Sequence, residues 1–204
     1  MSRQTWKPGT VVYPVPAVLI TCKDKDKENV FTVAWTGTIC SDPAMTYISV
    51  RKERYSYDII KNSKVFCINL TTRELAYATD YCGVKSGRNE NKFKKLNLET
   101  EMASVIDVPM IKKSPVTIEC KVEEIKELGS HDMFIAKVVA VNVDDKYIDE
   151  TGKFDMEKCD LMAYSHGKYY SLGESLGKFG FSVKKKYKSN KTLKKLIFRR
   201  FFIS

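Results

Sequence analysis

Short runs of β-branched and aromatic residues recur along most of the chain, separated by turn-forming residues. The runs are AVLITC (17–22), VFTVAWT (30–36), MTYISV (45–50), VFCINL (65–70), VTIECKVEEI (116–125) and MFIAKVVAVNV (133–143). Many short strands within one domain are typical of a β-barrel or a β-sandwich. The pattern therefore predicts a mainly β domain of antiparallel, Greek-key strands.

The last two runs predict a long antiparallel hairpin. Gly129 and Ser130 supply turn residues in the connection between them. In the first strand of this hairpin, polar residues alternate with apolar ones; they are Thr117, Glu119, Lys121 and Glu123. One face of the strand is therefore expected to face water.

Two helices are predicted between the strands. Ser56 is placed to cap a helix that runs to about Asn62, with Ile59 and Ile60 facing the core. The sequence TTRE at 71–74 is a capping box, which predicts the start of a helix that ends near Gly83. The predicted fold class is therefore α+β, with strands dominating.

Charge changes this picture only at the C-terminal end. The chain of 204 residues has 35 basic and 25 acidic residues, a net charge of +10. Nine of the basic residues and none of the acidic ones lie in 184–204, which leaves a net charge of +1 for 1–183. Residues 1–186 are expected to form one domain and 187–204 a basic extension. Two interpretations of the extension stay open: a disordered or non-native tail, and an amphipathic helix that contacts anionic membrane or nucleic acid.

The cysteines and histidines do not form a metal-binding pattern, and no metal is expected. Six cysteines occur without a CxxC pair, and His131 and His166 are far from any Cys/His cluster. The N-terminal stretch lacks the apolar segment of a secretory signal. We expect a cytoplasmic protein with reduced thiols, in which Cys67 and Cys120 act as small buried hydrophobic residues.

The segment 83–95, GVKSGRNENKFKK, carries groups that suit a phosphate monoester. Ser86 offers a hydroxyl, Gly87 an unhindered backbone N–H, Arg88 a planar fork of donors and Lys92 a point charge. The sequence contains neither GxGxxG after a strand nor GxxxxGK[ST], so a nucleotide would need another kind of phosphate site. Alone, the segment is more typical of a solvated basic loop.

A second cationic cluster follows the predicted strand 45–50. Arg51, Lys52 and Arg54 lie there, beside Ser56 at the start of a predicted helix. A strand end next to a helix N-terminus is a common position for an anion. We therefore expect the two basic segments to converge around one phosphate group.

The predicted strand VFTVAWT leaves space for a flat ring. Thr32, Ala34 and Thr36 would share one of its faces, and Val33 and Trp35 the other. Small and hydroxyl-bearing residues make room for a ring and offer hydrogen bonds to its edge. An ordinary barrel strand with outward-facing threonines is an equally good interpretation.

The order and spacing of these segments resemble the flavin reductase-like family of the FMN-binding split barrel, in particular its flavoredoxin branch. The resemblance is carried by YPVPAVLITC (13–22), NVFTVAWTG (29–37), DPAMTYISVRKERYSYDII (42–60), FCINL (66–70), DYCGVKSGRNENKF (80–93), SHDMFIAKV (130–138) and KYYSLG (168–173). It covers roughly residues 8–186. Ala44 stands where the family usually has a second proline, and Ser56 stands where a threonine is common, which keeps the hydroxyl.

The resemblance implies a split β-barrel that binds FMN. The residues that it implies for cofactor binding are Asn29, Thr32, Ala34, Trp35, Thr36, Ser49, Val50, Arg51, Ser56, Ser86, Gly87, Arg88 and Lys92. It also makes His131 the candidate catalytic residue, near the place where a nicotinamide donor approaches the flavin. Apart from the resemblance, a histidine in a hairpin turn before an aspartate is typical of an ordinary surface residue.

The function that the resemblance implies is that of an FMN-dependent oxidoreductase. It would take electrons from NADH, NADPH or a protein donor and pass them to a small-molecule or protein acceptor, and no residue pattern decides between the two nucleotides. A homodimer is expected, because the family builds its flavin site across a two-fold interface. The alternative is a non-enzymatic FMN electron-transfer module. A nucleic-acid-binding barrel is a weaker one, because the body lacks the aromatic and basic face of single-strand binders, and no nucleic-acid or membrane partner is expected.

Overall fold

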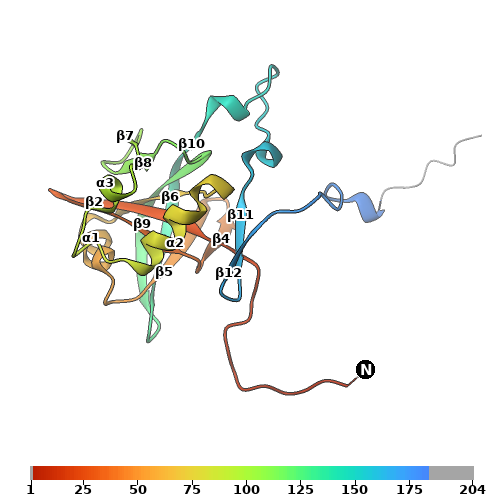
Figure 1. The fold of residues 1–204 in the computed structure, drawn as a ribbon, viewed down its shortest axis with the longest axis horizontal. Coiled ribbons are helices and arrows are strands. Elements are labelled where there is room, and N and C mark those ends of the chain that lie inside the picture. Colours follow the sequence, from red (N-terminus) through yellow and green to blue (C-terminus); the bar gives the residue numbers. More distant parts are fainter. Residues whose placement is uncertain (1, 184–204) are drawn as a thin grey trace, which may run out of the picture. The chain divides into compact units, whose positions relative to one another are not determined.

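The computed structural model of the chain describes residues 2–183 (Figure 1). Two compact units are distinguished, Met1–Leu172 and Gly173–Ser204, and the basic extension expected at 187–204 lies outside the described residues. The described part of the second unit contains one 3-10 turn, Phe181–Val183. None of the helices within 2–183 is long and apolar enough to cross a membrane.

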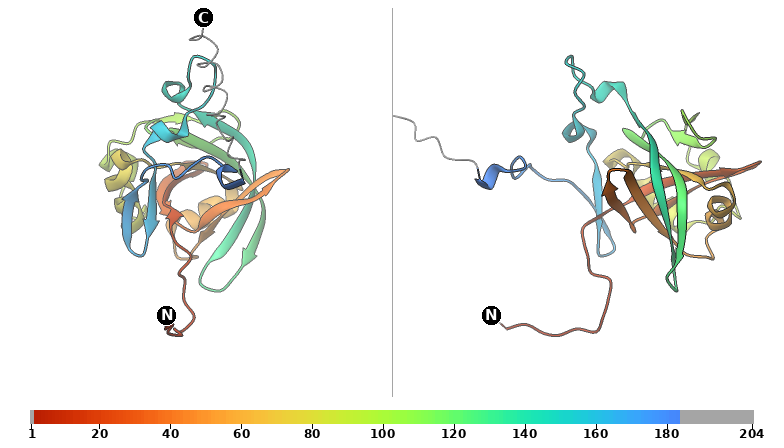
Figure 2. Two further views of the ribbon diagram at one scale, coloured as in Figure 1. Left: turned by 90° about the vertical axis from the view of Figure 1, so that its right-hand side faces the viewer. Right: turned by 180° about the vertical axis from the view of Figure 1, so that it is seen from behind.

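Seven strands of the first unit form one antiparallel sheet, which curls into a barrel (Figure 2). In spatial order they are β3 (Lys27–Val33), β2 (Val18–Asp24), β6 (Val65–Asn69), β9 (Val116–Glu127), β10 (Asp132–Val143), β5 (Ala44–Val50) and β4 (Thr36–Ser41). This order departs from the sequence order where β2 pairs with β6 and where β5 pairs with β10. The predicted mainly β barrel is confirmed.

Smaller elements surround the barrel. The strands β1 (Val15–Pro16), β11 (Met162–Ser165) and β12 (Lys168–Ser171) form a three-stranded sheet, and β7 (Thr100–Met102) pairs with β8 (Pro109–Ile111). The helices are α1 (Tyr55–Ser63), α2 (Ala76–Val84) and α3 (Lys92–Lys95), with 3-10 turns at Arg73–Leu75, Asp145–Tyr147 and Met156–Cys159.

The barrel interior is apolar. Ile20, Ile48, Phe66 and Phe134 are fully buried there, and Ile60 of α1 packs against them as predicted. Burial of a side chain of this size stabilises the fold by about 1.5–3 kcal/mol. The barrel is therefore a packed core, and any ligand site must lie at its surface.

The predicted strand 30–36 is wrong in one respect, because the structure breaks it in two. β3 ends at Val33 and β4 begins at Thr36. Between them, the backbone carbonyl of Trp35 accepts a hydrogen bond from the Ser49 N–H on β5, with an N···O distance of 2.9 Å. β3 and β4 are the two edge strands of the sheet, and the chain passes from one edge to the other at this point. Ala34 and Thr36 therefore do not lie on one face of a continuous strand.

The predicted helix caps are also wrong. The cap residue of α1 is Arg54 rather than Ser56, and Ser56 lies buried within the first turn. The TTRE sequence starts the 3-10 turn that leads into α2, but Thr72 makes no side-chain capping bond. The hydroxyl of Thr71 donates to the carbonyl of Ala17, which ties the segment before this turn to the chain between β1 and β2.

The prediction that one face of β9 is exposed to water is wrong for the first half of the strand. Glu119 is fully buried, because the connection between β7 and β8 covers it. Its carboxylate accepts hydrogen bonds from the backbone N–H groups of Ser104, Val105 and Ile106 at 2.8, 2.9 and 3.1 Å. Burial alone would raise the pKa of Glu119, but hydrogen bonds from the Ser104 hydroxyl, from Asn142 and from the backbone N–H groups of Ser104 and Val105 outweigh burial and hold the pKa below its ordinary value.

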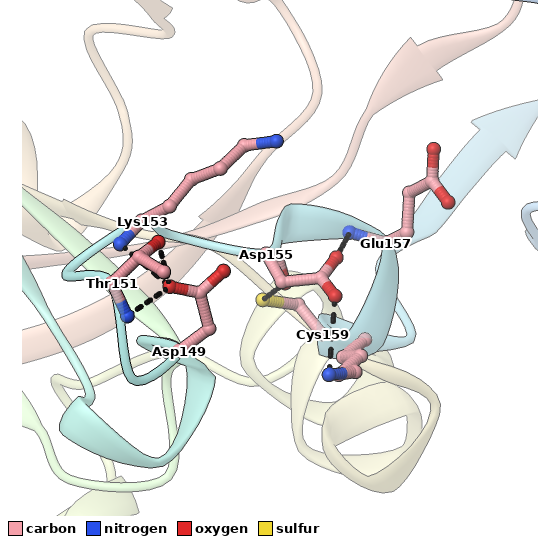
Figure 3. A network of polar contacts seen from close by, with 7 residues as sticks. Asp149, Thr151, Lys153, Asp155, Glu157 and Cys159 are labelled. Carbon is pink, nitrogen blue, oxygen red and sulfur yellow. Dashed lines mark hydrogen bonds and ion pairs between the residues drawn. The ribbon is translucent and has the colours of Figure 1, made fainter.

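The connection between β10 and β11 is shaped by local polar contacts (Figure 3). One carboxylate oxygen of Asp149 accepts bonds from the backbone N–H groups of Thr151 and Lys153 at 2.9 and 3.0 Å. Asp155 accepts in the same way from Glu157 at 3.2 Å. Aspartates that bond their own backbone in this manner fix tight turns without a hydrophobic core.

The prediction that Cys67 and Cys120 are small buried hydrophobic residues is confirmed. Cys67 and Cys120 are fully buried, and burial raises the pKa of Cys67 to about 12. Within residues 2–183, no group of three or more His, Cys, Asp or Glu side chains is arranged to hold a metal ion.

Candidate functional site

Two adjoining cavities lie at the end of the barrel where β3, β5 and α2 approach one another. We call them the aromatic cavity, of about 380 Å³, and the basic cavity, of about 410 Å³. They share Phe31, Arg51 and Arg54, so the two form one elongated site.

The cavities bring together every predicted site residue except Thr36. The aromatic cavity is lined by Thr32, Ala34, Trp35, Ser49, Val50, Arg51 and His131. The basic cavity is lined by Asn29, Arg51, Ser56, Ser86, Gly87, Arg88 and Lys92. Thr36 lines neither of these two cavities, because its hydroxyl turns away and donates to the Tyr47 carbonyl at 2.5 Å.

Arg88 joins the two basic segments. A guanidinium nitrogen of Arg88 donates to the backbone carbonyl of Glu53 at 2.8 Å. The same guanidinium lies 5.8 Å from the centre of the Tyr55 ring. The segments around 51–56 and 85–92 therefore meet, as the sequence predicted.

The hydroxyl of Ser56 retains its hydrogen-bond donor for a ligand. Its hydroxyl oxygen accepts a bond from the side-chain nitrogen of Asn29, with an N···O distance of 2.7 Å. A serine hydroxyl that accepts one bond can still donate another. Since Ser56 lines the basic cavity, its O–H is available to an anion there.

Gly87 lets the loop backbone lie directly against the barrel. A Cβ atom at this position would lie 2.3 Å from Oδ1 of Asn29 and 2.8 Å from a ring carbon of Tyr55. Both distances are far shorter than a van der Waals contact, so only glycine permits this approach. The backbone N–H groups of the loop are thereby held at the wall of the basic cavity.

Lys92 is a buried cation beneath the same loop. Its side chain is 2% exposed, and its ammonium donates to the carbonyls of Cys82 and Lys85, each at 3.2 Å. Burial lowers the pKa of Lys92 from its ordinary value. Its charge lies under the cavity, while its hydrogen bonds link the end of α2 to the loop that carries Ser86.

The basic cavity is strongly cationic. The positive side chains that line it are Arg51, Arg54, Lys85, Arg88 and Lys92, against the single carboxylate of Glu53. Cationic forks, hydroxyls and backbone N–H groups in one hollow form a typical site for a phosphate dianion.

The aromatic cavity has the shape and chemistry for a flat ring. Phe31 and Trp35 line it from the barrel, and Tyr164 and Tyr169 line it from the β11–β12 hairpin. The Thr32 hydroxyl donates to the backbone carbonyl of Thr79. Its oxygen can still accept a hydrogen bond, so Thr32 offers the edge of a ring an acceptor but not a donor.

His131 lies at the rim of the aromatic cavity, immediately before β10. Its Nδ1 is 2.9 Å from the hydroxyl of Ser130. The adjacent Asp132 is fully buried and accepts a bond from the Tyr57 hydroxyl at 2.5 Å, which anchors this end of the hairpin to α1. Burial and the nearby charge of Arg51 lower the pKa of His131, so its imidazole is neutral at pH 7.

Arg54 of the predicted second cationic cluster lines both cavities and donates to the Gly83 carbonyl at 2.8 Å. Sequence reasoning missed three other residues of the site. Tyr164 and Tyr169 enter from a hairpin whose signal was present in the sequence, since aromatic residues flank the turn residues of SHGK. Asp80 of α2 also lines the aromatic cavity and had no sequence signal.

The fold and the two cavities together define a β-barrel that suits a planar ring joined to a phosphate-bearing tail. The chain belongs to the flavin reductase like domain family, whose model matches residues 10–173. The resemblance inferred from the sequence is thus confirmed.

Known proteins and structures agree with this assignment. An uncharacterized protein of Archaeoglobus fulgidus is 30% identical over 164 residues, which are 80% of this chain and 91% of that protein. The structure is similar to that of flavoredoxin from Desulfovibrio vulgaris (Miyazaki F), with a TM-score of 0.82, 31% identity, and coverage of 90% of this chain and 100% of that one. It is also similar to flavoredoxin from Methanosarcina acetivorans, with a TM-score of 0.80, 26% identity and the same coverage.

The family and these neighbours support a flavin cofactor and a flavin-related redox role. They also identify the fold as the split barrel of flavin reductase-like proteins.

Proposed function

We propose that this chain is an FMN-dependent oxidoreductase that takes electrons from NADH or NADPH and passes them through the flavin to an acceptor. One observation carries the proposal: two segments distant in the sequence converge in a cationic cavity that opens into an aromatic one. A mononucleotide flavin has the same two parts, a phosphate and a planar ring.

The residues fit such a ligand. Ser56, Ser86 and Arg88 would hold the phosphate, and the backbone at Gly87 would approach it closely. Charge-assisted hydrogen bonds of this kind contribute about 1.5–3 kcal/mol each. Trp35 and the adjacent Ala34 would lie along the ring.

Bound FMN would supply the redox chemistry, since it can accept two electrons and a proton from a donor and return them to an acceptor. The protein's part is to bind, orient and shield. No side chain is required to act as a nucleophile. His131, neutral at the rim of the aromatic cavity, would orient the nicotinamide donor by a hydrogen bond.

A second candidate function retains the flavin without an enzymatic nicotinamide site. The similarity to two flavoredoxins favours it, because it suggests a flavin carrier that exchanges electrons with a protein partner. Steady-state oxidation of NADH or NADPH by the purified protein with FMN separates the two candidates. Turnover supports the oxidoreductase, and its absence supports the carrier.

We further propose that the chain acts as a homodimer. An aromatic cavity of about 380 Å³ lies at the lower end of the range for small-molecule sites and leaves little room to enclose a tricyclic ring from one chain alone. A molar mass of one chain in the FMN-loaded state, measured by light scattering, would contradict the dimer.

Replacement of Arg88 tests the proposal. In Arg88→Ala, we expect the affinity for FMN to fall by about 10- to 150-fold, because at least one charge-assisted bond is lost. The affinity for riboflavin, which has no phosphate, should hardly change. Lys94→Ala is the matched control, since Lys94 is an exposed cation of α3 close in the sequence that lines neither cavity. Stoichiometric flavin in purified Arg88→Ala would contradict the assignment.

A further inference from the structure

The β11–β12 hairpin forms one wall of the aromatic cavity. It lies beside the barrel, in a sheet of its own with β1 (Figure 1). It pairs with β1 through two residue pairs, Val15 with Tyr164 and Pro16 with Ala163. Within the described residues, neither β11 nor β12 joins the seven-stranded sheet. The wall of the cavity is therefore a separate element from the barrel.

The base of the hairpin is fixed by backbone contacts. The Met162 N–H donates to the Thr71 carbonyl at 3.2 Å, and Leu161 forms an isolated bridge with Thr72. At the other end, His166 and Gly167 form a two-residue turn with φ values of 48° and 83°. This end is also held, because Val15 pairs with Tyr164 beside the turn and the Tyr13 ring lies 6.2 Å from that of His166. The backbone of the hairpin is therefore fixed, and the side chains that face the cavity are the parts of this wall that can move.

One side-chain hydrogen bond holds the far part of the hairpin to α2. The phenol of Tyr169 donates to a carboxylate oxygen of Asp80 at 3.2 Å, and both residues line the aromatic cavity. The Tyr169 ring also lies 5.5 Å from that of Tyr164. Burial and Asp80 raise the pKa of Tyr169 to about 12, so the phenol remains a donor at neutral pH. The next residue, Tyr170, points to the opposite side of β12 and is 51% exposed.

The size of the cavity makes this contact important. At about 380 Å³, the aromatic cavity is near the lower limit for small-molecule sites. A flavin ring would occupy most of it, so a second planar reactant that stacks on that ring needs additional space. Phe31 is buried in β3, and the backbone of Trp35, between β3 and β4, is bonded to Ser49 of β5. The Tyr169 side chain on the opposite wall depends on its bond to Asp80 for its position.

We propose that Tyr169, held by Asp80, is a specificity-determining residue that controls the access of a planar second reactant to the ring part of the site. This proposal rests on the proposed function. With the bond formed, the Tyr169 ring stays against that of Tyr164 and narrows the cavity. With the bond broken, the Tyr169 side chain turns away from α2 and leaves space for a second ring such as a nicotinamide.

The opening can be measured without flavin, through the fluorescence of Trp35. The chain has two tryptophans, and Trp6 is 78% exposed in the N-terminal segment. In a Trp6→Phe background, the half-buried Trp35 reports on the aromatic cavity alone. Acrylamide is the quencher, because a neutral molecule does not respond to the charge of Asp80.

We expect Tyr169→Phe to raise the open population by about 2- to 12-fold, the equivalent of one lost hydrogen bond, and thereby to raise the quenching constant of Trp35. Asp80→Ala should produce the same increase from the other side of the bond. Tyr170→Phe is the matched control and should leave quenching unchanged. With FMN bound, Tyr169→Phe should lower the KM for NADH or NADPH while the affinity for FMN is unchanged.

Unchanged quenching in both Tyr169→Phe and Asp80→Ala would overturn the inference and leave the proposed function standing. An equal increase in Tyr170→Phe would also overturn it. Failure of the unmodified chain to bind FMN would instead refute the proposed function, and it would do so without altering the quenching result.

Discussion

Gly87→Ala is the substitution with the most specific consequence for the site. The added Cβ would lie 2.3 Å from Oδ1 and 2.6 Å from Cγ of Asn29, and 2.8 Å from a ring carbon of Tyr55. Asn29 cannot easily move, because its side chain is buried and bonded to Ser56. The exposed loop that carries Arg88 must therefore move outward.

The expected loss of affinity for FMN follows from the contacts that this movement breaks. Overpacking at a close contact costs about 1–3 kcal/mol of stability, which the loop avoids by leaving its position. The displaced loop then loses its contribution to phosphate binding, from the hydroxyl of Ser86 and the guanidinium of Arg88. Two charge-assisted bonds at about 1.5 kcal/mol each correspond to a roughly 150-fold loss of affinity for FMN.

The assay compares the dissociation constants of FMN and riboflavin by fluorescence titration. In Gly87→Ala, FMN binding should weaken by roughly 150-fold while riboflavin binding changes little, because only the phosphate contacts are displaced. Gly9→Ala is the control, since a Cβ there has only one neighbour, at 3.9 Å. If Gly87→Ala binds FMN as tightly as the unmodified chain, or loses both ligands equally, the reasoning about this loop is refuted.

Two further predictions concern Glu119 and His131. Glu119→Gln should lower the free energy of unfolding at pH 7 by about 2–6 kcal/mol, at roughly 1–3 kcal/mol for each of two buried N–H groups left without an acceptor, whereas Glu123→Gln on the exposed part of β9 should not. Because the folded-state pKa of Glu119 lies below its ordinary value of 4.5, this stabilisation is present above pH 4.5 and lost as the pH falls through the folded-state pKa; urea unfolding with no such loss would contradict the role of the carboxylate. His131→Ala should slow flavin reduction by NADH or NADPH in stopped-flow experiments more than it weakens flavin binding, and unchanged reduction rates would remove His131 from the mechanism. Since the pKa of His131 is lowered from 6.5, any rate loss due to its protonation should lie below pH 6.5 and vanish in the variant.

The barrel could be predicted because its strands are local patterns of β-branched and aromatic residues. The break between Val33 and Thr36 could not, since VFTVAWT continues as a strand by composition. The break depends on a hydrogen bond from Ser49, which is distant in the sequence. Long-range pairing of this kind leaves no trace in a short window of residues.

The burial of Glu119 shows a similar limit on predicting which polar residues face water. The alternation in β9 correctly identifies one side of the strand as polar, and Glu123 is indeed exposed. A connection from elsewhere in the chain covers Glu119 and brings three backbone N–H groups to it. The sequence pattern indicates which side is polar, but it does not indicate whether that side is covered.

The basic half of the site was more predictable than the aromatic half. Arg88, Lys92 and Ser56 could be selected because cations and hydroxyls near a helix start have one common use. The hairpin of Tyr169 has a sequence signal, but the roles of Asp80 and Tyr169 could not be predicted, because an aspartate on a helix and a tyrosine on a strand are common everywhere. Only their 3.2 Å contact across the cavity gives them a role.

A crystal structure of the chain with FMN tests the proposed site most directly. We expect the phosphate to lie in the basic cavity, within hydrogen-bonding distance of Ser56 and Arg88, and the ring to lie in the aromatic cavity against Trp35. A phosphate bound elsewhere, with the segments 51–56 and 85–92 free of contact with it, would contradict the assignment of these two segments to phosphate binding.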